Sequence, residues 1–313
     1  MKLNISLPFR VQLAKRLLPI CDDNLDNALQ EIRWLSEYVK LDLRSNAQLV
    51  NLPKSELEQK ENEKLEELVA QRVNLRKPLQ YILGTQPFGE LDIVTRPPVL
   101  IPRWETEEWT LKIVDNLNAN ISKFKAHYQR KLRILDVCSG SGCIALTFAA
   151  MLPSDTCEVV GLDNAQHAIS LSQLNKDLLS EKLSNPVKFQ LMDILDESSL
   201  ARIVQDGAYD MIVSNPPYIT RDEYRTLSPE VKLWEDPNAL VADDDGMLFH
   251  KRLASLSGQL SSKIKIPSIP RLAMEIGGEH QVEPMVAFLK AHNFESVQVW
   301  ADLAGRDRVI AAQ

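Results

Sequence analysis

Residues 132–145 read LRILDVCSGSGCIA, a short apolar run that passes through a glycine-rich loop into helix-forming residues. Glycines at such a turn let the backbone approach a ligand and leave helix-terminal N–H groups pointing at it. The residues from Gly140 onward also fit the G-x-G-x-x-A form of a dinucleotide fingerprint. Asp163 lies 21 residues after Gly142, at the end of the next predicted strand, where a carboxylate binds ribose hydroxyls. The pattern predicts a nucleoside-containing cofactor, and simple strand-to-helix turning is the alternative role for the glycines.

Short apolar runs recur beyond about residue 103, separated by segments long enough for crossover helices. The predicted strands are residues 132–137, 157–162, 187–191, 209–214, 272–276, 296–300 and 308–312. So few residues join the last two strands that they must run antiparallel. We therefore expect an α/β fold, a doubly wound and mostly parallel sheet of seven strands with one antiparallel strand at its edge.

The front of the chain has a different pattern. Residues 23 to about 76 read as helices, with Asn24 placed to cap the first and Pro53 to open the next. Residues 81–94 alternate between apolar and polar positions and are punctuated by glycine and proline, as in a β-hairpin. We expect a helical domain over residues 1–85, a β-hairpin linker over 86–102 and the α/β domain over 103–313.

The first twenty residues contain four Lys and Arg residues but no Asp or Glu, and apolar residues recur there at helical spacing. Such a segment resembles an amphipathic transit peptide. The same pattern fits the first helix of the mature fold, and both interpretations hold if a presequence covers only a few residues.

Composition narrows the function classes. The chain has 313 residues, 44% hydrophobic and 25% charged, which suits a globular protein of one or two domains. No apolar run approaches the roughly 18 residues of a membrane span. A net charge of −7 disfavours binding to a phosphate backbone and favours a protein or small-molecule substrate. The four cysteines form no C-x-x-C pair, so we expect no metal site and a reducing compartment.

A second motif, Asn215-Pro216-Pro217-Tyr218, directly follows the predicted strand at 209–214. In an open α/β sheet, ligands bind beyond the carboxyl ends of the strands, so these residues are offered to a substrate. The Asn215 side-chain oxygen and the Pro216 carbonyl each accept one hydrogen bond, and the prolines limit their movement. The Tyr218 ring can then lie against the planar group that carries these N–H donors. The motif therefore predicts a site that positions a planar NH2 group for group transfer. A plain turn is the alternative.

Four segments together resemble the S-adenosylmethionine-dependent methyltransferases that modify a glutamine in peptide-chain release factors. They are the two motifs above, VLIPRWETE at residues 99–107 and DLAGRDRV at residues 302–309. The likeness runs through nearly the whole chain. Cys138 stands where the family usually has Gly, Trp104 stands where Pro is usual, and residues 234–240 match only loosely.

The resemblance implies a Rossmann-like class I methyltransferase fold, S-adenosyl-L-methionine as cofactor and a release factor as protein partner, recognised by the helical domain. Asn215, Pro216, Pro217 and Tyr218 are the implied catalytic residues, which hold the glutamine amide of a Gly-Gly-Gln loop. Asp163 is implied to bind the ribose, and Asp193 with Ile194 the adenine. The full implied cofactor set is Arg103, Glu105, Thr106, Cys138, Ser139, Gly140, Ser141, Gly142, Asp163, Asp193, Ile194 and Asn215.

The expected mechanism is direct displacement, in which the glutamine amide nitrogen attacks the sulfonium methyl group and loses a proton afterwards. No metal is needed, and no general base is assigned. His167, His250, His280 and His292 are predicted to be structural, and Glu275 to be a packing or capping residue.

Three other functions share parts of this pattern. A base-directed amino methyltransferase has the same tetrapeptide, but this acidic chain has no evident basic groove. A nicotinamide oxidoreductase shares the glycine loop and leaves the tetrapeptide without a role. A binding protein with an inactive cofactor site is disfavoured by the intact Asp163, Asn215 and Tyr218. We expect no direct nucleic-acid or membrane partner and a mitochondrial location, with the cytoplasm as the alternative.

Overall fold

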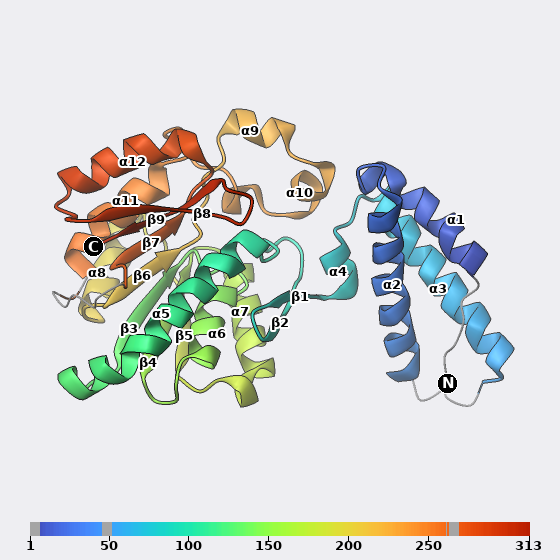
Figure 1. Cartoon of the computed structure of the whole chain (residues 1–313), viewed down its shortest axis with the longest axis horizontal. Coiled ribbons are helices and arrows are strands. Elements are labelled where there is room, and N and C mark those ends of the chain that lie inside the picture. The colour runs from blue at the N-terminus through green and yellow to red at the C-terminus, as the bar shows by residue number, and fades with distance from the viewer. Residues whose placement is uncertain (1–6, 46–51, 261, 263–268) are drawn as a thin grey trace. The chain divides into compact units, whose positions relative to one another are not determined.

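The computed structural model describes residues 7–45, 52–260, 262 and 269–313, and it divides into two units (Figure 1). The first, here called the helical unit, comprises Met1–Gly84 and the later segment Ser228–Trp234. The second, the α/β unit, comprises Thr85–Leu227 and Glu235–Gln313. The sequence pattern did not predict that residues 228–234 belong with the front of the chain.

The helical unit is built on α1 (Leu7–Leu17), α2 (Leu25–Ser45), α3 (Lys54–Asn74), the single-turn α4 (Leu79–Leu83) and α10 (Pro229–Trp234). Its core consists of the apolar faces of the first three helices, with Leu17, Leu35 and Leu65 fully buried. The predicted helix starts are confirmed: the Asn24 side chain accepts hydrogen bonds from the backbone N–H groups of Asp26 and Asn27, and α3 begins after Pro53.

The packing of α1 bears on the two interpretations of the first twenty residues. Leu13, Ala14 and Leu17 are buried in the core of the helical unit. Residues 7–17 therefore form a helix that packs into the fold, as the second interpretation expects. Residues 1–6 lie outside the described residues.

Partly buried ion pairs attach the segment 228–234 to the rest of the helical unit. The Arg72 guanidinium binds Glu31 through two nitrogens, at 3.0 and 3.1 Å, and also lies 3.3 Å from Glu230. Arg76 contributes a second contact to Glu230 at 2.8 Å. The Trp234 indole donates to the Leu75 carbonyl at 2.9 Å. Since nearly buried charges are stable only when paired, these contacts fix the segment to α3.

The α/β unit starts with a hairpin of β1 (Thr85–Phe88) and β2 (Leu91–Val94). The predicted hairpin is confirmed, but residues 81–83 belong to helix α4 rather than to a strand. The following sheet has the order β5-β4-β3-β6-β7-β9-β8. Its strands are β3 (Leu132–Val137), β4 (Cys157–Asp163), β5 (Val187–Leu191), β6 (Met211–Ser214), β7 (Leu272–Glu275), β8 (Val297–Ala301) and β9 (Asp307–Ala312).

The seven-stranded, mostly parallel sheet is confirmed, with one correction. Strand β9 is antiparallel to both β7 and β8, so it lies between them and the sheet ends with β8. The expectation that the reversed strand lies at the edge was wrong. The short β8–β9 connection forces the antiparallel pairing, and the apolar run of β9 fits an inner position where both faces are covered.

Helices cover both faces of the sheet (Figure 1). One face packs against α5 (Trp104–Tyr128) and α6 (Cys143–Met151), with α7 (Gln166–Leu178) beside them. The other face packs against α8 (Glu197–Gln205), α11 (Leu248–Leu260) and α12 (Glu279–Ala291). The short helix α9 (Arg221–Thr226) follows β6. The two buried layers leave the carboxyl ends of the central strands as the place for a ligand.

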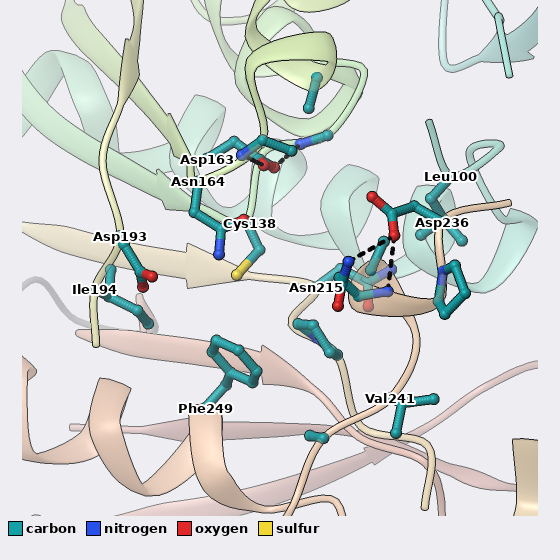
Figure 2. A pocket seen from close by; sticks show the side chains of 18 of the residues that line it. Leu100, Cys138, Asp163, Asn164, Asp193, Ile194, Asn215, Asp236, Val241 and Phe249 are labelled. Carbon is teal, nitrogen blue, oxygen red and sulfur yellow. Dashed lines mark hydrogen bonds between the residues drawn. The ribbon is translucent and has the colours of Figure 1, made fainter. Parts of the chain in front are cut away.

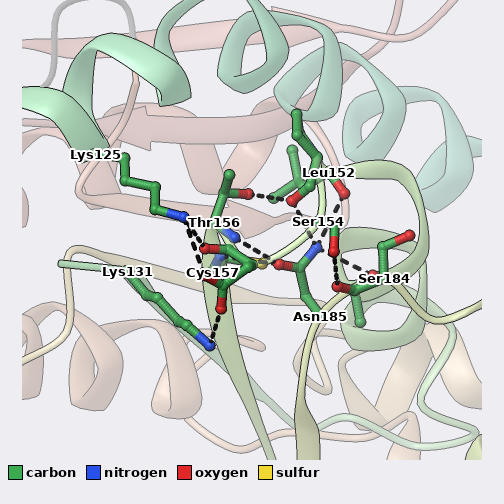
Figure 3. Close-up of polar contacts among 11 residues, drawn as sticks. Lys125, Lys131, Leu152, Ser154, Thr156, Cys157, Ser184 and Asn185 are labelled. Atoms are coloured by element: carbon green, nitrogen blue, oxygen red, sulfur yellow. Dashed lines mark hydrogen bonds and ion pairs between the residues drawn. The ribbon is translucent and has the colours of Figure 1, made fainter.

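At the amino ends of β4 and β5, a buried asparagine joins three segments (Figure 3). The Asn185 side-chain oxygen accepts from the backbone N–H groups of Thr156 and Cys157, at 2.9 and 3.1 Å. Its NH2 group donates to carbonyls at the end of α6, including that of Leu152 at 2.9 Å. Asn185 thus fixes the α6 terminus and the start of β4 to the loop before β5, and anchors the elements that carry the glycine loop.

Candidate functional site

The carboxyl ends of β3, β4, β5 and β6 border a cavity of about 860 Å³ within the α/β unit (Figure 2). Its other walls come from residues 99–100, from the first turn of α7, from α9, from the loop 236–243 and from the first turn of α11. This volume lies in the range of cavities that hold small molecules and cofactors. The cavity therefore occupies the position at which the sequence predicted a cofactor.

The glycine loop and Asp163 meet at the cavity wall. The Asp163 carboxylate accepts from the backbone N–H of Gly140 and from that of Ala165, both at 2.9 Å. Burial raises the pKa of this carboxyl, and the two backbone donors oppose the rise. Gly142 has φ +83°, and a Cβ there would lie 2.7 Å from the Phe189 ring, so only glycine fits this turn.

The twelve implied cofactor residues fall into three groups, and the third, Arg103, Glu105 and Thr106, is described below. Six line the cavity: Cys138, Gly140, Asp163, Asp193, Ile194 and Asn215. Ser139, Ser141 and Gly142 are not among the described lining residues, and both serines are buried. Those three residues shape the loop behind the cavity surface.

The cavity also contains residues that the sequence analysis missed. Asn164 directly follows Asp163, and Phe249 projects from α11 (Figure 2). His167, predicted to be structural, lines the cavity and lies 3.2 Å from a carboxylate oxygen of Asp236. The position of Asn164 immediately after a strand-end carboxylate was the available sequence signal. Phe249 and Asp236 come from distant segments and gave none.

The Asn-Pro-Pro-Tyr segment follows β6 and borders the cavity through Asn215 and Pro217. The Asn215 side-chain nitrogen donates to the Thr106 hydroxyl at 3.0 Å. Pro216 is buried and the Tyr218 hydroxyl donates to Glu275 at 3.1 Å. Burial raises the pKa of the Tyr218 phenol, so it remains a neutral donor at physiological pH.

Glu275 was predicted to be a packing or capping residue, and in the structure it accepts hydrogen bonds from three side chains. Its carboxylate, 1% exposed at the end of β7, accepts from Thr106 at 2.6 Å, from the Trp109 indole at 2.9 Å and from Tyr218. Burial raises the pKa of this carboxyl, and the three donors oppose the rise. Glu275 thus connects the start of α5 to the tetrapeptide.

The backbone of Tyr218 is also held in place. Its carbonyl accepts from the Gln281 side chain at 3.0 Å, and the Gln281 side-chain oxygen accepts from the Gly277 N–H at 2.8 Å. Gly246, with φ +78°, passes so close that a Cβ there would lie 2.1 Å from the Tyr218 carbonyl oxygen. The Tyr218 N–H donates to the Leu240 carbonyl. The Tyr218 backbone is therefore held by hydrogen bonds to Gln281 and Leu240 and by close packing against Gly246.

Arg103, Glu105 and Thr106, implied to close over the cofactor, are not among the described residues that line the cavity. Arg103 instead forms an ion pair with Glu235, whose carboxyl is buried. Burial raises the pKa of Glu235, and the Arg103 charge opposes the rise. Because Glu235 immediately precedes the cavity-lining loop, Arg103 holds that loop in place. The cofactor role of these three residues stays a prediction.

The described residues also bear on metal binding and on membrane insertion. They hold no group of three or more His, Cys, Asp and Glu side chains arranged for a metal ion. They also hold no helix that is long and apolar enough to cross a membrane.

Comparison with known proteins places this site in context. The family model for the methyltransferase small domain matches residues 114–231. A release factor glutamine methyltransferase of Fusobacterium nucleatum is 34% identical over 93% of this chain and 79% of its own length. The probable MRF1 mitochondrial N(5)-glutamine methyltransferase mtq1 of Schizosaccharomyces pombe is 31% identical over 74% of each chain. The mitochondrial MRF1 N(5)-glutamine methyltransferase MTQ1 of Saccharomyces cerevisiae is 41% identical over 53% of this chain and 50% of its own.

Proposed function

Since the chain belongs to the family of release factor glutamine methyltransferases, we propose that its cavity binds S-adenosylmethionine next to a glutamine of a peptide-chain release factor. The enzyme transfers a methyl group from S-adenosylmethionine to the side-chain amide nitrogen of that glutamine. Its sheet is that of a Rossmann-like class I methyltransferase. The observation that carries the proposal is the position of Asn215, which follows the β6 strand end and borders the same cavity as Asp163.

The residues at the strand ends suit the parts of the methyl donor. Both oxygens of Asp163 are oriented by backbone N–H groups, and their other lone pairs are available to ribose hydroxyls. Asp193 accepts from the Leu195 N–H through one oxygen, which leaves the second oxygen for the adenine amino group. Ile194 and Phe249 supply apolar surface for a ring. When bound, the donor supplies an electrophilic methyl group.

The tetrapeptide addresses the weak nucleophilicity of an amide. The lone pair of an amide nitrogen is delocalised, so the reaction needs the NH2 group held with its face toward the methyl carbon. The Asn215 side-chain oxygen and the Pro216 carbonyl are the acceptors assigned to the two N–H groups, and the Tyr218 ring is assigned to the amide plane. Holding two reacting groups in the right geometry is worth several orders of magnitude in rate without a general base.

An amino methyltransferase acting on a nucleic-acid base is not favoured. The relatives described above are glutamine methyltransferases, and the net charge of −7 is unsuited to a phosphate backbone. A protein substrate fits both observations.

We assign recognition of the release factor to the helical unit and the methylated glutamine to a Gly-Gly-Gln loop. We also assign the enzyme to the mitochondrial matrix, with the cytoplasm as the alternative. Support for this location comes from the two yeast relatives named as mitochondrial, which are 31% and 41% identical to this chain. Fractionation of cells that express the tagged protein tests the location.

The decisive experiment is incubation of the protein with radiolabelled methyl donor and, separately, a release factor, an RNA, a DNA and free glutamine. Label is expected in the release factor alone, and peptide mapping should place it on one glutamine. An Asn215→Ala variant should lose transfer while its affinity for the donor stays within about threefold, since only the substrate-facing acceptor is removed. Label in a nucleic acid, or none in any release factor, contradicts the proposal.

A further inference from the structure

A buried carboxylate connects the two side chains that are assigned to the substrate amide. Glu275 accepts from the Tyr218 hydroxyl through Oε1 at 3.1 Å and from the Thr106 hydroxyl through Oε2 at 2.6 Å. The Thr106 oxygen lies 3.0 Å from the Asn215 side-chain nitrogen. Glu275 and Thr106 are both 1% exposed, so water does not compete for these hydrogen bonds.

The direction of each hydrogen bond follows from the chemistry of the groups. The Trp109 indole N–H is only a donor, and it points at Glu275 Oε2 at 2.9 Å. The hydroxyl groups of Thr106 and Tyr218 also point at this carboxyl group, so Glu275 accepts from three side-chain donors. Thr106 has one hydroxyl proton and gives it to Glu275. Its oxygen is therefore left to accept, and the group that it faces on Asn215 must be the NH2.

This polarity sets which end of the Asn215 amide faces the substrate. The NH2 group is held by Thr106, so the amide oxygen occupies the other branch of the side chain, and Asn215 itself borders the cavity. The oxygen and nitrogen ends of an asparagine amide are nearly equal in size, so packing alone does not distinguish the two orientations. In the flipped orientation an N–H donor would face the N–H groups of a glutamine amide.

We propose that Thr106 and Glu275 are positioning residues that hold the Asn215 amide with its oxygen toward the substrate NH2 and keep the Tyr218 ring in place. The inference rests on the proposed function for the identity of the substrate. The directions of the hydrogen bonds follow from residues of this chain alone and do not depend on which substrate is bound. Neither residue is among the described residues that line the cavity, so both are proposed to act through Asn215 and Tyr218.

Three variants on one helix test the proposal. Thr106→Val removes the hydroxyl and keeps the shape, whereas Thr106→Ser keeps the hydroxyl. Thr110→Val is the matched control, because Thr110 is equally buried one turn later and its hydroxyl donates only to the Thr106 backbone carbonyl. Thermal unfolding of all three variants measures any general damage to α5.

We expect kcat for release-factor methylation to fall about 10- to 100-fold in Thr106→Val, the cost of a misoriented group in an active site. Thr106→Ser should stay within about threefold of the wild type, as should Thr110→Val, and the KM for the methyl donor should change little in all three. Glu275→Gln, which replaces an acceptor oxygen by a donor, should resemble Thr106→Val. Equal kcat for Thr106→Val and Thr106→Ser, or an equal loss in Thr110→Val, overturns the proposal.

A second measurement needs no substrate. The Asn215 side-chain NH2 gives a ¹H–¹⁵N signal that Asn215→Ala identifies, and its solvent exchange should accelerate at least about tenfold in Thr106→Val but not in Thr106→Ser. Unchanged exchange in Thr106→Val overturns the positioning role. If the wild type methylates no release factor, the proposed function fails on its own, and the exchange rates still decide whether Thr106 orients Asn215.

Discussion

Asp163 shows how one side chain serves the fold and the ligand together. Its carboxylate orients the glycine loop through Gly140 and the start of α7 through Ala165, while it borders the cavity. Replacing it should therefore weaken the binding of the methyl donor more than it weakens the fold.

We predict that Asp163→Ala lowers the affinity for S-adenosylmethionine at least about tenfold, since a hydrogen bond to a charged group contributes roughly 1.5–3 kcal/mol. Isothermal titration calorimetry measures the change. Asp177→Ala, on the exposed side of α7, is the control and should bind the donor normally. Wild-type affinity in Asp163→Ala would remove the ribose role.

His250 gives the protein a predictable response to acid. The ring is fully buried on α11 and donates to the Glu275 carbonyl at 2.8 Å. Burial lowers its pKa from 6.5 to about 4. As pH falls from 6.5 toward 4, the unfolded chain therefore gains a proton at this residue that the folded chain does not, and the free energy of unfolding falls.

The loss attributable to His250 is roughly 3 kcal/mol across that window, from the size of the pKa difference. Other buried groups also change protonation in this pH range. The test is therefore the difference in the free energy of unfolding between the wild type and a variant that lacks His250. Urea unfolding of the wild type and of His250→Gln at several pH values should give curves that converge as the pH falls. Parallel curves contradict the assignment.

At the residue level, the sequence identified those site residues that lie at the ends of predicted strands. It did not identify the residues that reach the site from distant segments. Asp163 is the last residue of β4 and Asn215 directly follows β6, so their place beside a ligand was predictable. The pairing of Thr106 with Glu275 spans 169 positions. That contact requires the start of α5 to lie against the end of β7, an arrangement that no local pattern specifies.

At the level of elements, Gly246 controls the geometry of the tetrapeptide without touching the cavity surface. Its φ is +78°, and a Cβ there would overlap the Tyr218 carbonyl oxygen, at 2.1 Å, and the Gln281 side chain. Gly305 has the same backbone angle, φ +77°, but no described atom lies within 4 Å of a Cβ built there.

We predict that Gly246→Ala reduces kcat at least about tenfold, because the Tyr218 backbone must move. Gly305→Ala should cost only the strain of a left-handed residue, about 1–2 kcal/mol, and leave kcat near that of the wild type. Kinetics and thermal unfolding of the pair separate the two effects. Similar kcat values in both variants would mean that the contact with Tyr218 is unimportant.

The predicted strands matched the observed ones within a few residues, because buried parallel strands are continuous apolar runs. The position of β9 between β7 and β8 was missed. The short connection between β8 and β9 requires these two strands to pair antiparallel. It does not determine which of the two strands pairs with β7. Residues 81–83 were assigned to the hairpin because an apolar run that short fits a strand or a helical turn equally well.

For the whole molecule, the function of the helical unit is best sought on its surface, because its core serves only to pack the helices together. Helix α2 exposes Trp34 and Leu41, which are 45% and 68% accessible and lie two turns apart on one face. Tryptophan is enriched among the residues that dominate protein–protein binding energy.

We predict that the double variant Trp34→Ser, Leu41→Ser raises the KM for an intact release factor about tenfold or more and leaves kcat and donor affinity nearly unchanged. Leu178→Ser, which alters a 63% accessible leucine on α7, is the control. An unaltered KM in the double variant would argue against recognition through this face of the helical unit.

The excursion of residues 228–234 into the helical unit matters for anyone who builds hybrids of such enzymes. The chain crosses between the two units after residues 84, 227 and 234, so the front domain is encoded in two separate pieces. A chimaera that exchanges only the first piece would leave Glu230 and Trp234 facing foreign surfaces in place of Arg72 and Leu75. A working graft must transplant both pieces as a set.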